Sequence, residues 1–157
     1  NVINMIRYDE IIENSPHLVC YLISLIKTHD FHINYYIKNE TEILPSQYFM
    51  LMFLYYDMGT NQSDIAKACL MDRSGVSRAF KDFEEKGLLT REVDEKNRRA
   101  YKIRLTEKGI KTAELLAEKE TEWEDMICNE LDIDRDDLFK LLSSLSMKSL
   151  VFNREKL

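Results

Sequence analysis

The sequence predicts a mainly helical α+β fold in which long helices accompany a single short β-hairpin. Hydrophobic residues make up 45% of the 157 residues and charged residues 32%, as in folded globular chains. Only four Gly and two Pro are present, which disfavours β-sandwiches because these need many turns. Apolar residues recur at three- and four-residue steps through most of the chain, and the period becomes that of strands only between residues 88 and 105.

Two helices are expected before residue 60. The first pattern covers residues 8–37, although Pro16 suits a first helical turn better than an interior position and leaves the start of the helix open. Its apolar positions are Ile11, Ile12, Leu18, Leu22, Leu25 and Ile26. The second helix is expected to begin near Pro45 and to run to about Met58, where Gly59 ends it.

Two shorter helices joined by a tight connection predict a helix-turn-helix. Asn61 can cap the first, over residues 62–70. Asp72 can cap the second, over residues 73–86, which Gly87 can end in the left-handed conformation. The apolar stripe of this second helix consists of Val76, Ala79, Phe80 and Phe83, at the spacing of one helical face.

A short hairpin follows the helix-turn-helix within a few residues. Residues 88–93 and 100–105 have the pattern of two strands, and residues 94–99 form a charged tip between them. A helix-turn-helix followed by such a hairpin is a winged helix-turn-helix.

Further helices are expected after the hairpin. Thr106 can cap a helix over residues 107–130, which has a glutamate-rich exposed face. The last segment, residues 134–152, carries an apolar stripe wide enough to pack on a partner: Leu138, Leu141, Leu142, Leu145 and Leu150. The fold class is therefore a winged helix-turn-helix flanked by N- and C-terminal helices.

The formal net charge of −6 is unevenly distributed. Residues 60–105 hold 11 Lys and Arg against 8 Asp and Glu, whereas the remaining residues hold 11 against 20. An acidic total ordinarily disfavours nucleic acid as a partner, but the winged segment by itself is basic. Charges of one sign also gather on a surface simply because they are solvated there. The basic segment therefore indicates DNA binding only if a DNA-binding motif accompanies it.

The face of residues 73–86 opposite the apolar stripe supplies that motif. It carries Arg73, Ser74, Gly75, Ser77, Arg78 and Lys81. The Arg78 guanidinium can bind guanine O6 and N7 in the major groove, and the serines can donate to phosphates or base edges. The alternative is an ordinary solvated amphipathic helix. The hairpin tip favours DNA, because Lys96, Arg98 and Arg99 can reach the narrow, electronegative minor groove.

These residues resemble the MarR family of winged-helix transcriptional regulators. The resemblance runs through residues 44–48, 62–66, 72–78, 84–89, 94–99 and 105–109 in unbroken order. Departures are small: Gly75 and Ser77 stand where the family often has threonine, and Asn97 stands where the family's wing usually has aspartate. These departures concern the preferred DNA sequence and leave the fold unchanged.

The resemblance implies a homodimeric regulator, in the first place a repressor, that binds a pseudo-palindromic operator in double-stranded DNA. Residues 1–44 and 107–157 are expected to form the helical dimerisation region, and residues 45–106 the DNA-binding domain. Arg98 is assigned to the minor groove, whereas Arg99 either joins it or pairs with Asp94 to stiffen the wing.

The resemblance also implies release from DNA by a small aromatic or phenolic effector, bound between the dimerisation helices and the winged helix. Candidate lining residues are His17, Tyr21, Tyr35, Tyr36, Tyr48, Phe49 and Met52. Aromatic residues at helical spacing are more often core residues, so both interpretations stay open.

A redox-sensing regulator of the same fold is an alternative. Cys20 stands at the same separation from Gln47 as the reactive cysteine in the organic-hydroperoxide branch of the family. The two tyrosines that accompany that cysteine are replaced by Asn34 and Pro45. An inert packing cysteine is the competing interpretation, since reactivity needs a lowered pKa, for which His17 is the nearest candidate helper.

No metal site or cofactor is predicted. His17 and Cys20 form one suitably spaced pair and His29 and His32 form another, but about 18 Å of straight helix separates the two pairs.

Other function classes fit the sequence less well. Nucleophile elbow, phosphate loop, HExxH and dinucleotide motifs are missing from the sequence, so an enzyme is not expected. A winged helix used for protein–protein contact would need an apolar recognition face, whereas the face described above carries Arg, Ser and Lys side chains. Three widely spaced cysteines, short apolar runs and no secretory signal predict a cytoplasmic protein without a membrane partner.

Overall fold

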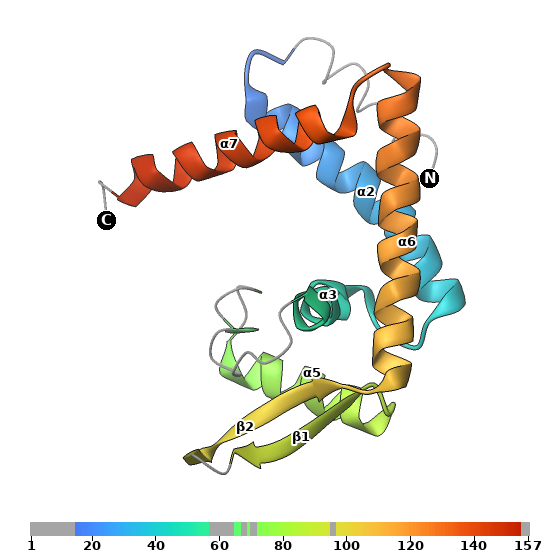
Figure 1. Ribbon diagram of the computed structural model, residues 1–157, viewed down its shortest axis with the longest axis vertical. Coiled ribbons are helices and arrows are strands. Elements are labelled where there is room, and N and C mark those ends of the chain that lie inside the picture. The colour runs from blue at the N-terminus through green and yellow to red at the C-terminus, as the bar shows by residue number, and fades with distance from the viewer. Residues whose placement is uncertain (1–14, 57–64, 67–68, 70–71, 95–96, 155–157) are drawn as a thin grey trace. The chain divides into compact units, whose positions relative to one another are not determined.

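The computed structural model describes residues 15–56, 65–66, 69, 72–94 and 97–154 (Figure 1). Its elements are α2 (Leu18–Glu40), the 3₁₀ turn η1 (Pro45–Gln47), α3 (Tyr48–Tyr56), α5 (Arg73–Glu85), β1 (Leu89–Asp94), β2 (Asn97–Leu105), α6 (Glu107–Glu130) and α7 (Arg135–Arg154). The chain divides into two compact units, residues 1–119 and 120–157. The predicted mainly helical α+β class is confirmed.

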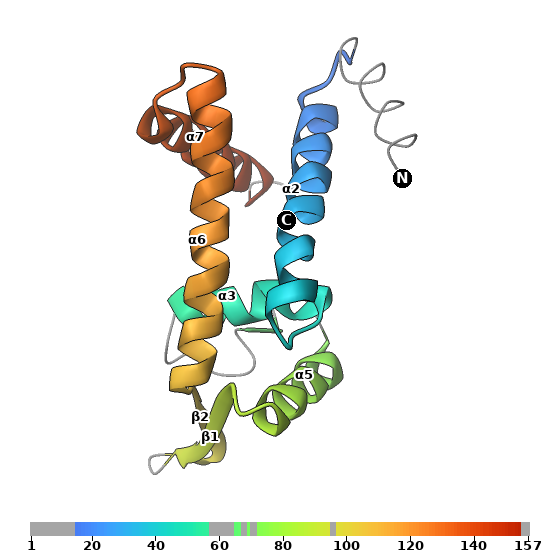
Figure 2. The ribbon, with the colours of Figure 1, turned by 90° about the vertical axis from the view of Figure 1, so that its right-hand side faces the viewer.

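The core of the first unit surrounds α3, which lies between α2 and α5 in Figure 2. The sequence of α3 is apolar or aromatic throughout, as expected for a helix that neighbours cover on several sides. Met50, Leu51 and Leu54 are almost completely buried, and Ile33 and Ile37 of α2 belong to the same core cluster. This core supports α5 and the hairpin from one side.

The N-terminal helix begins later than predicted. His17 has extended backbone angles and α2 starts at Leu18, so the expectation of helix through residues 15–17 is wrong. Pro16 explains why Ser15 is not helical, because a proline disfavours helical geometry in the residue before it. The helix continues to Glu40, and residues 8–14 lie outside the described part of the chain.

The predicted start at Pro45 is confirmed, with a first turn that is a 3₁₀ helix. The predicted end at Met58 and Gly59, the cap at Asn61 and most of the helix 62–70 lie outside the described residues. Within that last range, Ile65 and Ala66 are helical and buried.

Helix α5 begins at the predicted residue, Arg73, and ends at Glu85, one residue before the predicted end. The Asp72 side chain accepts a hydrogen bond of 2.6 Å from the Gly75 N–H, and Gly87 has a φ of 69° just beyond the helix. Val76, Ala79, Phe80 and Phe83 are all buried, which confirms the predicted stripe. The cap fixes where the helix starts, and the stripe fixes which face it turns away from the core.

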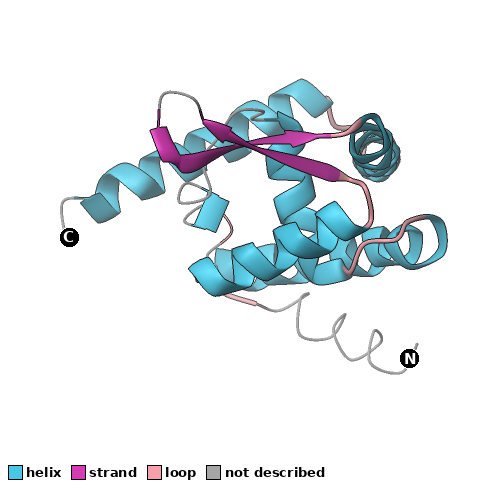
Figure 3. Ribbon diagram, turned by 90° about the horizontal axis from the view of Figure 1, so that it is seen from below, coloured by secondary structure: helices cyan, strands magenta, loops and turns pink. Residues whose placement is uncertain are grey.

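Strands β1 and β2 form an antiparallel hairpin and lie side by side in Figure 3. The predicted tip of residues 94–99 is too long, because β2 begins at Asn97 and pairs that residue with Asp94. Hairpin loops of two residues are strongly preferred, so the pairing continues past Val93 through a local irregularity. Arg98 and Arg99 therefore belong to β2.

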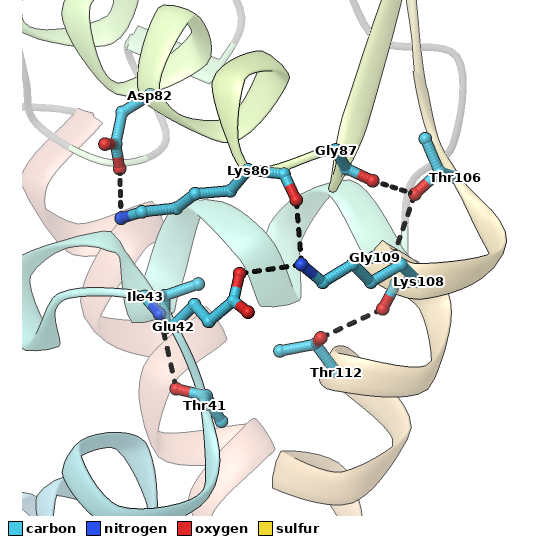
Figure 4. Close-up of polar contacts among 10 residues, drawn as sticks. All are labelled: Thr41, Glu42, Ile43, Asp82, Lys86, Gly87, Thr106, Lys108, Gly109 and Thr112. Carbon is cyan, nitrogen blue, oxygen red and sulfur yellow. Dashed lines mark hydrogen bonds and ion pairs between the residues drawn. The ribbon is translucent and has the colours of Figure 1, made fainter.

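Helix α6 begins directly after the hairpin and is tied to the end of α5. The Thr106 hydroxyl accepts a 3.1 Å hydrogen bond from the Gly109 N–H, as predicted for the cap, and donates a 2.6 Å bond to the Gly87 carbonyl (Figure 4). Gly109 has no room for a side chain, since a Cβ there would lie 2.1 Å from the carbonyl oxygen of Leu88. The hairpin base, the end of α5 and the start of α6 thus form one packed junction.

The second unit consists of the end of α6 and α7. Asp134 accepts a 3.0 Å hydrogen bond from the Asp137 N–H at the start of α7, and Arg135 pairs with Glu124 across the turn and stacks on Phe139. The predicted leucine stripe is on α7, where Leu141, Leu142, Leu145 and Leu150 are exposed within this chain. No helix within the described residues is long and apolar enough to cross a lipid bilayer.

Candidate nucleic-acid interface

The outer face of α5 gathers most of the predicted recognition residues. Ser74, Ser77, Arg78 and Lys81 are all exposed, and Gly75 is half-buried. They lie opposite the buried stripe of the same helix, so its hydrophobic burial turns them toward solvent. Arg73 is the first residue of the helix, and its side chain lies outside the described part.

The first turn of α5 is organised around Asp72. Its carboxylate accepts from the Gly75 N–H at 2.6 Å and from the Ser74 hydroxyl at 2.7 Å, and these bonds lower the pKa of Asp72. Asp72 therefore acts as the helix cap and holds the Ser74 hydroxyl at the helix N-terminus. Helix N-termini favour anions, so this turn can approach a phosphate.

The two basic side chains further along the face make few directed contacts within the chain. Arg78 Nε donates to the Ser74 carbonyl at a long 3.4 Å, and Lys81 Nζ lies 3.6 Å from Glu85 in a largely exposed pair. Exposed pairs of this kind contribute little to stability. Both cations can therefore exchange these contacts for a ligand at low cost.

The other end of α5 is held by contacts that the sequence analysis missed. The Gln47 side chain donates a 2.7 Å hydrogen bond to Asp82, and Glu84 pairs with Arg91 of β1. Hydrogen bonds from Lys86 and Gln47 lower the pKa of Asp82, and the hydrogen bond from Arg91 lowers that of Glu84. A signal for Gln47 exists in the sequence, because a glutamine at the third helical position can close a capping box.

The hairpin carries the predicted wing residues. Arg98 and Arg99 lie at the start of β2, whereas Lys96 and the side chains of all three residues lie outside the described part. The suggested pairing of Arg99 with Asp94 also falls outside it. The hairpin backbone nevertheless places both arginines at its far end, away from the junction with α6.

The predicted effector residues are spread between core and surface. Tyr48 and Met52 are buried in the core, and Tyr36 is half-buried with its ring edge-on to His32. Tyr21 is partly exposed and donates to the Ser15 carbonyl at 3.0 Å. His17, Tyr35 and Phe49 are exposed. A shallow depression among the described residues is lined instead by Glu40, Glu107, Lys108, Lys111, Thr112 and Leu115.

The cysteines and histidines lie on several elements and do not gather into one site among the described residues. Cys20 is half-buried on α2, Cys128 is buried, and burial raises the pKa of the Cys69 thiol. His32 Nε2 lies 3.1 Å from the carbonyl oxygen of Lys119, and the His29 ring packs beside Tyr48. Within the described ranges, no three His, Cys, Asp or Glu side chains are grouped as metal ligands.

Comparison with known proteins adds a family to this geometry. The sequence model of the MarR family matches residues 42–100. The uncharacterized HTH-type transcriptional regulator YybA of Bacillus subtilis is 32% identical over 49% of this chain and 51% of its own length. The chain spans about half the length of the curated relatives it matches.

Solved structures match over a larger part of the chain. A MarR transcriptional regulator from Methanosarcina mazei Go1 is 26% identical over 84% of this chain and 95% of its own, with a TM-score of 0.71. MepR of S. aureus, in its complex with DNA, is 31% identical over 80% of this chain and 98% of its own, with a TM-score of 0.57.

Proposed function

Because this chain belongs to the MarR family of winged helix-turn-helix transcriptional regulators, we propose that it binds double-stranded DNA sequence-specifically and represses transcription. The observation that carries the proposal is the outer face of α5. A capped helix with a fully buried stripe turns Ser74, Ser77, Arg78 and Lys81 outward together. The similarity to MepR, whose structure was solved on DNA, supports the same use of this fold.

In this proposal α5 enters the major groove and the hairpin follows the neighbouring minor groove. Arg78 binds a guanine edge through its guanidinium, while Ser74, Ser77 and Lys81 contact phosphates or base edges. Arg73 and Gly75 lie in the first turn, where the backbone approaches the DNA. Arg98, together with Arg99 and Lys96, supplies positive charge at the minor groove.

The proposed active form is a homodimer. Leu18, Val19, Leu22 and Ile26 of α2 are exposed within one chain, and so are four of the α7 leucines, Leu141, Leu142, Leu145 and Leu150. Exposed apolar surface on this scale usually marks an interface, and a two-fold symmetric dimer presents two copies of α5 to a pseudo-palindromic site. Residues 1–44 and 107–157 form the dimerisation region in this proposal, and residues 45–106 form the DNA-binding domain.

Release by a small aromatic or phenolic effector belongs to the same proposal. The dimer can adopt a geometry that reaches both half-sites of the operator and another that does not. A ligand that binds the second geometry more tightly shifts the population toward it and so releases the DNA. Among the described candidates, the side chains with exposed surface are His17, Tyr21, Tyr35 and Phe49, and Tyr36 is half-buried.

A footprint on the DNA that flanks the chain's own gene tests the proposed function. The expected result is a protected region with two half-sites about one helical turn apart, because a two-fold dimer places its recognition helices at that spacing. Uniform protection at all positions, or none at concentrations that saturate a nonspecific duplex, contradicts the proposal.

A further inference from the structure

A buried glutamine links α5 to the segment that follows α2. The side chain of Gln47 is only 6% exposed, and its two polar atoms are both used. Oε1 accepts a 2.8 Å hydrogen bond from the Leu44 N–H, and Nε2 donates a 2.7 Å hydrogen bond to Asp82 Oδ2. A polar side chain is buried at a cost unless its bonds are satisfied, so this orientation is strongly preferred.

The contact continues through the end of α5 to the start of α6. Lys86 Nζ donates to the same Asp82 oxygen at 2.6 Å, and the Lys86 carbonyl accepts a 2.9 Å bond from Lys108 Nζ. Lys108 Nζ also donates to Glu42 at 2.6 Å, as Figure 4 shows. Glu42 precedes Leu44 by two residues, so the contacts close a ring. We call this set, Glu42, Leu44, Gln47, Asp82, Lys86 and Lys108, the polar ring.

The polar ring supplies what the apolar core beneath α5 lacks. The buried stripe, with Val76 and Phe80, sets which face of α5 points outward, but hydrophobic contacts are non-directional and tolerate small rotations of the helix about its axis. Hydrogen bonds weaken steeply when their angles change. Asp82 lies one helical turn from Arg78 on the same helix. If α5 rotates about its axis at Asp82, the Arg78 guanidinium therefore moves relative to a base edge.

We propose that Gln47 and Asp82 are positioning residues for DNA reading. They fix the rotation of α5 about its own axis relative to the segment after α2, and neither side chain touches DNA. The inference rests on the proposed DNA-binding function and adds specificity-determining residues outside the recognition face. In this inference the polar ring also connects α2 to the recognition helix, so that a change in the position of α2 changes the orientation of α5.

Exchanging the donor and the acceptor of the hydrogen bond between Gln47 and Asp82 tests this role. Gln47→Glu removes the donor and leaves two carboxylates facing each other, which breaks the ring. In the double variant Gln47→Glu/Asp82→Asn, the new carboxylate accepts from the Leu44 N–H and from the new amide. The oxygen of that amide can accept from Lys86 Nζ once the lysine moves to it from the atom that now faces residue 47, so each partner keeps a bond and the total charge is unchanged.

The binding partner for the test is a duplex selected from a random pool by the wild-type protein, compared with a scrambled duplex of equal length. Gln47→Glu is expected to weaken binding to the selected duplex about fivefold or more, the value of one base contact, and to leave the scrambled duplex within about twofold. The salt dependence of binding stays that of the wild type, because no phosphate contact is removed. The double variant is expected to recover the selected-site affinity.

Two controls separate positioning from folding and charge. Asn129→Asp makes the same amide-to-carboxylate change at an exposed position on α6 outside the ring, and it is expected to bind like the wild type. Asp82→Ala removes a partly exposed side chain without adding a charge, so it is expected to fold and to lack the ring even if Gln47→Glu does not fold. Thermal denaturation monitored by circular dichroism verifies that each variant is folded at the assay temperature.

The outcomes are distinguishable. A wild-type protein without preference for the selected duplex overturns the proposed function, and the inference with it. A wild-type preference that a folded Gln47→Glu or Asp82→Ala variant keeps in full overturns the inference alone. Failure of the folded double variant to recover also overturns it, because a purely structural role predicts loss of stability without a bond-specific rescue.

Discussion

Side chains of α5 divide between two faces with different tasks. Phe80 and Phe83 are buried and hold the helix on the core, whereas Arg78 and Lys81 are exposed and weakly engaged. Stability and recognition therefore depend on different residues of one helix. Substitutions on the outer face are expected to change DNA binding without unfolding the chain.

Arg78→Ala is expected to reduce affinity for the selected duplex by about 1–3 kcal/mol, because one bidentate base contact is lost. A gel-shift titration on selected and scrambled duplexes measures the loss. Lys111→Ala is the matched control, since it removes one exposed positive charge on α6. Equal losses for the two variants would mean that Arg78 contributes only charge.

Gly109→Ala is expected to destabilise the fold by about 1–3 kcal/mol, as overpacking of a tight contact does. The added Cβ would lie 2.1 Å from backbone oxygen of Leu88, which cannot move without shifting the hairpin base. Denaturant unfolding monitored by circular dichroism measures the change. Gly87→Ala is the comparison, because a Cβ there meets open space and costs only left-handed backbone strain, about 1 kcal/mol. A stabilised Gly109→Ala variant, as helix propensity alone predicts, contradicts this account of the junction.

At the scale of elements, the boundaries set by a local chemical signal were predictable. Asp72, Gly87 and Thr106 act through their own neighbours in sequence, and each cap lies where the pattern places it. The start of α2 and the tip of the hairpin were predicted less well. Apolar periodicity continues across Pro16, and strand pairing depends on the partner strand, which the local pattern does not specify.

The contacts that hold α5 in place were beyond prediction from the sequence. Gln47 and Asp82 are far apart along the chain, as are Lys108 and Glu42. Nothing local pairs these residues until α5, α6 and the segment that follows α2 pack together. By contrast, the exposed face of α5 was predictable, because a buried stripe at helical spacing fixes the opposite face as well.

Acidification is expected to weaken the attachment of α5. Hydrogen bonds lower the pKa values of Asp72, Asp82 and Glu84 in the folded chain. A carboxylate with a lowered folded pKa stabilises the fold fully above its unfolded value, about 4, and loses that contribution as the pH falls through the folded pKa. Unfolding free energy is therefore expected to decrease below about pH 4.

Denaturant unfolding at several pH values between 7 and 3 measures this decrease. Asp72→Asn keeps a capping acceptor but no longer titrates, so its stability is expected to fall less steeply with acid. An identical pH dependence in the wild type and in Asp72→Asn contradicts the assignment of Asp72 as a contributor.

At the scale of the whole molecule, charge and apolar surface are divided between different parts of the chain. The net charge of −6 combines a basic segment, residues 60–105, with acidic flanking helices. The flanking helices also carry the exposed leucines. In the proposed dimer their apolar residues are covered by the partner, and their acidic residues disfavour DNA on other surfaces.

Leu145→Glu is expected to weaken the proposed dimer. Leu145 is 46% exposed within one chain, so a charge there costs the monomer little and places an unpaired carboxylate in the interface. Sedimentation velocity over a concentration series measures the shift toward monomer. Ser143→Glu adds the same charge about half a turn away on α7 and is expected to remain dimeric. Unchanged association of Leu145→Glu excludes this face of α7 from the interface.

The preference of the wild-type protein for one DNA sequence tests the central claim most directly. A duplex enriched from a random pool and a scrambled duplex of the same composition are titrated with the protein at physiological salt. If α5 reads base edges, the selected duplex binds about 10³-fold more tightly or better. If the protein binds the selected and the scrambled duplex with equal affinity, and both affinities fall equally as salt is raised, binding depends on charge alone. That result would contradict sequence-specific recognition.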